Sequence, residues 1–103
     1  MQGYCLKFYV HEFHKTNGKL TYEWLLEKAL ALKIHGGSAF RALAGFGKHG
    51  ILHEEHFLEL ASEVPVEVIF YLQEDEASAL LQAIKEKDLS LYYVKFPAEY
   101  GTL

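Results

Sequence analysis

The stretch from Arg41 to His56 carries most of the residues that could do chemistry. It contains Gly45-Phe46-Gly47, and Lys48 and His49 follow at once. Glycines let the backbone adopt conformations closed to other residues and let a ligand approach the main chain closely. Backbone N–H groups, an ammonium group and an imidazole could therefore converge on one anion. An ordinary glycine-containing hairpin bend would leave the same pattern, because short glycine motifs are weak evidence without their structural context.

Histidine is unusually frequent, with 6 in the chain, and three of them fall in or near this stretch at His49, His53 and His56. The spacing of His53 and His56 could place both imidazoles on one side of a helical turn. Zinc, nickel and copper accept imidazole ligands, and Glu54 or Glu55 could complete a site. Histidines are more commonly ordinary surface or core residues, so a metal site is the secondary hypothesis.

Arg41 lies inside an apolar segment. An arginine there needs either a carboxylate partner or an anionic ligand. Glu12 and Glu67 are the candidate partners for an ion pair. The sequence leaves both interpretations open, a structural ion pair and phosphate binding.

The length, the composition and the net charge limit the class of protein. A chain of 103 residues with 50% apolar and 23% charged residues is typical of one globular domain, spanning residues 1–103. The net charge of -4 and the lack of a long basic block argue against nucleic-acid binding. Cys5 is the only cysteine, which excludes an intrachain disulfide and a cysteine-rich zinc site.

No apolar run is long enough to span a bilayer, and the first residues lack the features of a signal peptide. We therefore expect a cytoplasmic protein. No Walker loop, serine-histidine-aspartate order or paired-carboxylate signature is present, so we expect no enzymatic activity.

Hydrophobic periodicity predicts the order strand, helix, strand, strand, helix, strand. The predicted strands are Tyr4–Val10, Ala39–Phe46, Val64–Leu72 and Leu89–Phe96, with a short return at Phe57–Leu60. Two such split βαβ units form an α+β, ferredoxin-like βαββαβ domain, a four-stranded antiparallel sheet with both helices on one face.

The ends of these elements also carry signals. Thr21 could cap the first helix, and His35-Gly36-Gly37 should end it. The second helix should run from the acidic Glu74 to the basic Lys87. Pro97 should stop the last strand and leave the tail from Ala98 loose unless it packs on a partner.

The predicted architecture leaves one face of the sheet uncovered, and this sequence does not make that face polar. Tyr9, Ile69 and Tyr71 should lie there, together with Tyr92 or Tyr93. Exposed apolar patches of several hundred Å² usually mark interfaces. We therefore expect a closed homo-oligomer with the sheets facing inward. Alternatively, the tyrosines simply present their hydroxyl ends to water.

Much of the chain resembles the PII-like family of unknown function (domain of unknown function one hundred and ninety). The residues that carry the resemblance are Leu6-Lys7-Phe8-Tyr9 with Glu12, Leu20-Thr21-Tyr22-Glu23, Phe40-Arg41-x-Leu43-x-Gly45-Phe46-Gly47-x-His49, His53 and Val64-Pro65-Val66. The resemblance implies a homotrimer of ferredoxin-like subunits, related to PII nitrogen-regulatory proteins and to CutA. In PII proteins the Gly-Phe-Gly lies at the base of a mobile loop that docks on transporters or enzymes, and adenine nucleotides bind nearby in clefts between subunits.

Carried over, the resemblance implies that Gly45, Phe46, Gly47 and Lys48 line such a cleft and that residues 49–56 form a much shortened loop. The chain departs from the pattern, however, because it has no Arg-x-Arg pair of the kind that PII proteins use on phosphates near the carboxyl terminus.

The first functional hypothesis is therefore a PII-like signalling protein that binds a small anionic effector, with an adenine nucleotide as the first candidate. Its ligand-binding residues would be Arg41, Gly45, Phe46, Gly47, Lys48 and His49. The alternative is a CutA-like metal-binding or metal-tolerance trimer that uses His49, His53 and His56. A third hypothesis is a structural trimer that binds only protein.

Overall fold

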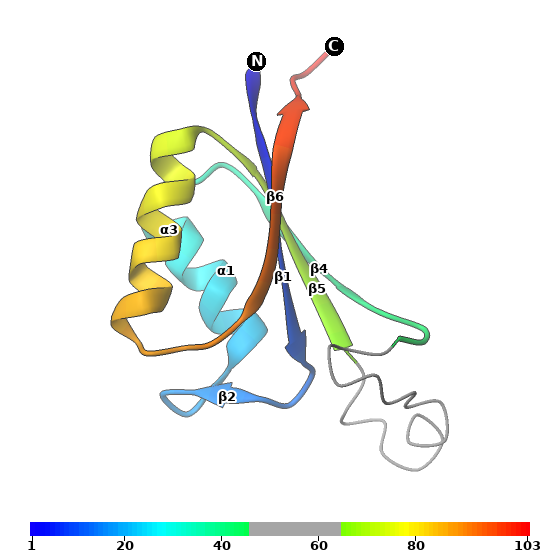
Figure 1. Ribbon diagram of the computed structural model, residues 1–103, viewed down its shortest axis with the longest axis vertical. Coiled ribbons are helices and arrows are strands. Elements are labelled where there is room, and N and C mark those ends of the chain that lie inside the picture. Colours follow the sequence, from blue (N-terminus) through cyan, green and yellow to red (C-terminus); the bar gives the residue numbers. More distant parts are fainter. Residues whose placement is uncertain (46–64) are drawn as a thin grey trace.

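The computed structural model describes residues 1–45 and 65–103, in which two helices lie on one face of a four-stranded antiparallel sheet (Figure 1). The strands, in the order β4-β5-β1-β6, are β4 (Gly37–Arg41), β5 (Pro65–Leu72), β1 (Gln2–His11) and β6 (Tyr92–Glu99). The helices are α1 (Thr21–Ala31) and α3 (Glu74–Glu86), and a small hairpin of β2 (Lys15–Thr16) and β3 (Lys19–Leu20) precedes α1. This arrangement confirms the predicted ferredoxin-like plan.

The core lies between the sheet and the helices, and it is built from alternate residues of the two central strands. Leu6 of β1 pairs with Phe70 of β5, and Phe8 pairs with Val68. All four side chains are buried, and the rings of Phe8 and Phe70 meet edge to face with centroids 6.2 Å apart. Each such side chain contributes about 1.5–3 kcal/mol on burial. The helices add Trp24, Leu25, Ala29, Ala77, Leu80, Ala83 and Ile84.

Several strand boundaries differ from the prediction: β1 is longer at both ends, and β6 begins at Tyr92 and not at Leu89. The second predicted strand runs from Ala39 to Phe46, but β4 runs from Gly37 to Arg41, and residues 42–45 are not in a strand. Apolar composition alone could not indicate this end, because the pairing with β5 decides it. The last predicted strand stops before Pro97, but β6 continues to Glu99.

Pro97 lies inside β6, opposite Tyr4 of β1. Proline lacks a backbone N–H donor, but an edge strand tolerates it because one side of that strand needs no partner. The order of the described sheet places β6 at such an edge. The tail is also held beyond the strand, since the N–H of Tyr100 donates to the carbonyl of Met1 at 3.0 Å. The prediction of a loose tail from Ala98 is therefore wrong, and both ends of the chain lie together (Figure 1).

The start and end of α1 differ from the prediction as well. The N-cap is Leu20, while Thr21 is the first helical residue and is fully buried. Its hydroxyl lies 2.8 Å from the hydroxyl of Thr16 and 2.6 Å from Nδ1 of His14, so it bonds the hairpin instead of capping the helix. At the other end the left-handed residue is Lys33, with φ 66°, and not one of the predicted glycines.

The boundaries of α3 match the prediction closely. Its acidic first turn, Glu74-Asp75-Glu76, lies at the positive end of the helix dipole, and Lys85 lies in the last turn. The N–H of Gln73, the N-cap, donates to Oε1 of Glu76 at 2.7 Å. No helix in the described part of the chain is long and apolar enough to cross a membrane.

Candidate functional site

Arg41, Gly45 and Pro65 lie together where β4 ends and β5 begins. Arg41 pairs with Val66, and the N–H of Ala42 donates to the carbonyl of Pro65 at 2.9 Å. A β-carbon added at Gly45 would lie 3.7 Å from Cγ of Pro65, which is ordinary contact. Of the predicted ligand site, the structure therefore describes Arg41 and Gly45, both beside the start of β5. The other predicted residues, Phe46, Gly47, Lys48, His49, His53 and His56, and the short return Phe57–Leu60, lie outside the described residues.

Arg41 has a carboxylate partner, and of the two candidates it is Glu12. A terminal guanidinium nitrogen of Arg41 donates to Oε2 of Glu12. The Arg41 side chain is 64% exposed, whereas that of Glu12 is only 13% exposed. The guanidinium has five N–H donors, and this bond uses one nitrogen. Arg41 therefore forms an ion pair and still presents donors to solvent.

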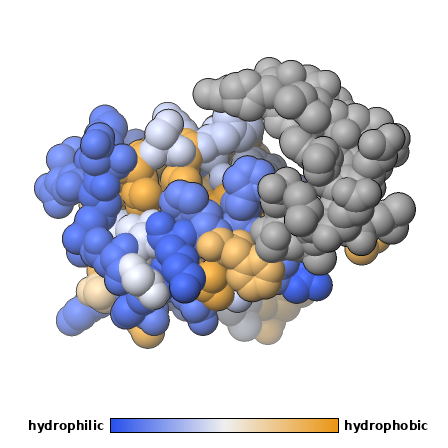
Figure 2. Space-filling model, turned by 90° about the horizontal axis from the view of Figure 1, so that it is seen from below, coloured by the Kyte–Doolittle hydropathy of each residue, from blue (hydrophilic) through white to orange (hydrophobic). Residues whose placement is uncertain are grey.

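The end of the molecule at which these residues lie has a mixed character. Figure 2 views the molecule from below the view of Figure 1 and shows several hydrophobic areas between hydrophilic ones.

Glu67, the other candidate partner, lies on the opposite face of the sheet. It pairs with Phe40 of β4 and Tyr9 of β1, and its carboxylate lies 3.8 Å from the ammonium group of Lys7. Burial, followed by the hydrogen bond to Glu67, raises the pKa of Tyr9 to about 12. A charged pair and a neutral tyrosine therefore lie at the centre of the face that the helices do not cover.

This uncovered face, which we call the open face, is rich in exposed aromatic side chains. Phe40, Tyr71, Tyr92 and Phe96 are between 42% and 67% exposed. The register places Tyr92 opposite Tyr9 and Tyr93 opposite Phe8, so Tyr92 belongs to the open face and Tyr93 to the helix side. Sequence reasoning missed Phe40 and Phe96 on this face; the register places Phe40 opposite Glu67 and Phe96 opposite Cys5.

Cys5 lies on the open face but is only 1% exposed. Burial raises the pKa of its thiol; the positive charge of Lys7 opposes this rise and the negative charge of Glu67 adds to it. Lys7 also lies 5.8 Å from the centre of the Phe96 ring. Cys5 is therefore a small buried residue of β1.

A hollow of about 400 Å³ opens alongside β4. Its lining includes His35, Gly37, Phe40, Tyr71 and Tyr100. The rings of Tyr71 and Tyr100 lie with centroids 6.3 Å apart. The lining extends along β4 from Gly37 to Phe40 and reaches Ile69 and Tyr71 on the open face of β5.

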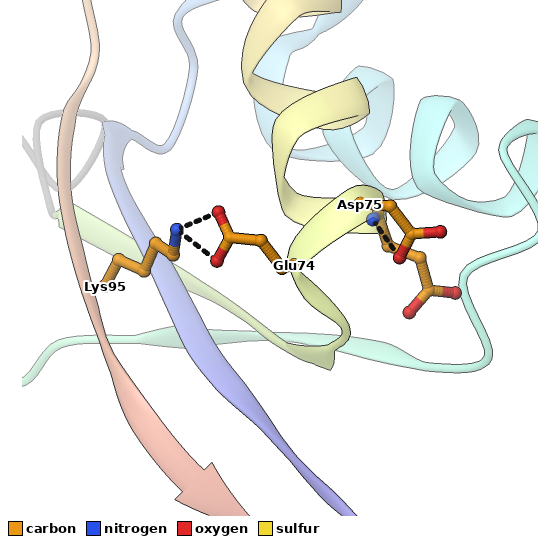
Figure 3. Close-up of polar contacts among 4 residues, drawn as sticks. Glu74, Asp75 and Lys95 are labelled. Atoms are coloured by element: carbon orange, nitrogen blue, oxygen red, sulfur yellow. Dashed lines mark hydrogen bonds and ion pairs between the residues drawn. The ribbon is translucent and has the colours of Figure 1, made fainter.

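A second ion pair joins α3 to β6 (Figure 3). The ammonium group of Lys95 donates to both carboxylate oxygens of Glu74 at 2.9 Å and lies 4.4 Å from the centre of the Tyr4 ring. The hydrogen bond from Lys95 lowers the pKa of Glu74, and the same bond raises the pKa of Lys95. Figure 3 also shows Asp75, whose Oδ1 accepts a hydrogen bond from the backbone N–H of Glu76. These contacts hold the start of α3 against the edge strand and stabilise the folded structure.

Within residues 1–45 and 65–103, no group of three or more histidine, cysteine, aspartate or glutamate side chains could hold a metal ion. The predicted metal ligands His49, His53 and His56 lie outside these ranges. The described geometry therefore provides an exposed guanidinium, that of Arg41, and an aromatic face.

Residues 3–89 match the DUF190 family, described as an uncharacterized ACR. A UPF0166 protein of Aquifex aeolicus (strain VF5) is 33% identical over 82 residues, which cover 80% of this chain and 78% of that protein.

Several solved structures share the fold, including the following two. CPII of Thiomonas intermedia K12, in a structure bound to ADP and bicarbonate, superposes with a TM-score of 0.67 at 20% identity, covering 99% of this chain and 91% of CPII. A putative PII-like signaling protein of Thermus thermophilus gives a TM-score of 0.62 at 12% identity, covering 94% of this chain and 86% of that one. From its sequence and its PII-like fold, the chain belongs to the DUF190 family, a PII-like family of unknown function.

Proposed function

We propose that this protein is a PII-like regulatory protein that binds a small anionic effector beside Arg41. The observation that carries the proposal is the position of the Arg41 guanidinium, which is exposed where β4 ends and β5 begins. A planar guanidinium suits phosphate and carboxylate oxygens, which it can bind with two parallel hydrogen bonds. Gly45 would let the backbone approach the ligand, and Phe46, Gly47, Lys48 and His49 would complete the site.

An adenine nucleotide is the first candidate effector. CPII, which shares the fold, is a nitrogen regulatory PII-like protein with a structure bound to ADP, AMP and bicarbonate. The bicarbonate bound to CPII makes that ion a second small anion to test.

The open face supports a homotrimer as the working assembly. Its aromatic side chains would lose contact with water when three copies bring their sheets together. Ligand clefts would then form between subunits, close to Arg41. The effector would regulate a protein partner, such as a transporter or an enzyme, only if it bound two states of the assembly unequally.

Calorimetry of the purified protein against ATP, ADP, AMP, adenosine and bicarbonate tests the effector. We expect at least one nucleotide to bind, and we expect Arg41→Gln to weaken its binding about tenfold or more because a charge-assisted hydrogen bond is lost. The matched control is Lys19→Gln, which removes one positive charge from a surface pair with Glu27. An intact oligomer that binds none of these compounds would rule out the proposed effector class.

A further inference from the structure

Glu12 and Arg41 come from strands that are not neighbours in the sheet. Glu12 follows β1, Arg41 ends β4, and β5 lies between those two strands. The pairs His11–Pro65 and Arg41–Val66 place both side chains at the first residues of β5. Their bond therefore spans the strand that begins at Pro65.

The two partners are unequal in their access to water. Glu12 has only 13% of its side chain exposed, and a carboxylate withdrawn from water depends on a cation. Arg41 keeps 64% of its side chain exposed, with donors that the bond to Glu12 does not use. The guanidinium is thus neutralised from one side and accessible to solvent from the other.

An anion that approaches the exposed side meets a cation whose charge is already offset. At the separations within one binding site, repulsion between the anion and the Glu12 carboxylate is comparable in size to the attraction by Arg41, since both fall with the inverse of distance. The binding of an anion to Arg41 must therefore overcome the electrostatic repulsion by the Glu12 carboxylate.

We propose that Glu12 is the resident counterion of the anion site: it neutralises Arg41 in the empty protein and gives up that cation to the phosphate of an entering effector. This inference rests on the function proposed above and assigns Glu12 the role of limiting the affinity for phosphate-bearing ligands. The ligand class is a phosphate oxyanion on a nucleotide, and Glu12 itself does not need to touch it.

Glu12→Gln removes the negative charge at this position but keeps the Arg41 side chain in place, because the amide oxygen still accepts the hydrogen bond from Arg41. We expect the affinity for ADP and for pyrophosphate to rise about tenfold, as removal of one nearby like charge allows. Adenosine, which carries no phosphate, should bind the variant and the parent equally. The matched control is Glu27→Gln, which makes the same change of net charge at the surface pair with Lys19 and should leave all three affinities unchanged.

The double variant Glu12→Gln, Arg41→Gln leaves no unpaired charge, and its thermal unfolding checks that it is folded. We expect the double variant to lack the increase in pyrophosphate affinity that Glu12→Gln shows. Unchanged or weaker binding of ADP and pyrophosphate by Glu12→Gln would overturn the inference while the proposed function stands.

One further outcome separates the inference from the proposed function, and another contradicts both. Binding of pyrophosphate by Glu12→Gln, with no binding of any nucleotide by the parent protein, would support the counterion role and contradict the proposed effector. Absence of binding in every variant would contradict both.

Discussion

A β-carbon at Gly37, the first residue of β4, would stand 2.5 Å from Cε1 of Phe70 in the neighbouring strand. Phe70 is fully buried in the core and lies opposite Gly37 in the register. We therefore expect Gly37→Ala to lower the free energy of unfolding by about 1–3 kcal/mol, because a packed aromatic ring would have to move. Urea unfolding followed by circular dichroism measures the change.

Gly36 is the matched control for this substitution. A β-carbon there would meet no atom within 4 Å, and its φ is not in the left-handed region. Gly36→Ala should therefore be neutral or slightly stabilising. Equal stabilities of the two variants would show that Phe70 adapts without cost.

Glu74 and Lys95 predict a pH dependence of stability at the start of α3. The pKa of Glu74 is lowered in the folded state by its hydrogen bond with Lys95, so its stabilising effect is present above the pKa of the unfolded chain and is lost as the pH falls through the folded-state pKa. The melting temperature of Glu74→Gln should fall below that of the parent at neutral pH, and the gap should close in acid. A double-mutant cycle with Lys95→Met isolates the pair, and a coupling that is the same at both pH values would contradict this account.

Tyr9 should titrate far above an ordinary tyrosine. Its pKa is raised to about 12 by burial and by the hydrogen bond to Glu67, so the folded state holds its proton more tightly than the unfolded chain does. The stability that this provides is complete below the unfolded pKa and is lost as the pH rises through about 12. The difference between ultraviolet titrations of the parent and Tyr9→Phe isolates this group among the 7 tyrosines. Glu67→Gln should lower the midpoint, and an ordinary midpoint in the parent protein would disprove the shift.

We expect subunits to associate through the open face. We expect Phe40→Glu and Phe96→Glu to reduce the mass measured by light scattering, because a charge would be buried between subunits without a partner. Leu30→Glu is the matched control, since Leu30 is 74% exposed on α1, on the helix side of the sheet. A parent protein that is monomeric, or face variants that keep the parent mass, would contradict the proposed trimer.

The candidate site was only partly predictable. The need of Arg41 for a carboxylate or an anion follows from its charge among apolar neighbours, and the sequence offered Glu12 and Glu67 as equal partners. The sheet decided between them, because β5 carries Glu67 to the open face and the end of β1 brings Glu12 to Arg41. Whether Phe46, Gly47, Lys48 and His49 join the site stays a prediction.

The sequence by itself determined the order and type of the main helices and strands but not the small β2–β3 hairpin, since the alternation in β1 and β5 and the charged ends of α3 depend on residues that are close along the chain. The tertiary structure alone decided where β4 ends, that Pro97 is accepted inside β6, and that Tyr92 and not Tyr93 lies on the open face. These outcomes depend on pairing between strands that are far apart in the chain. Local hydrophobic patterns do not encode that register, because a shift of one residue exchanges the two faces of a strand.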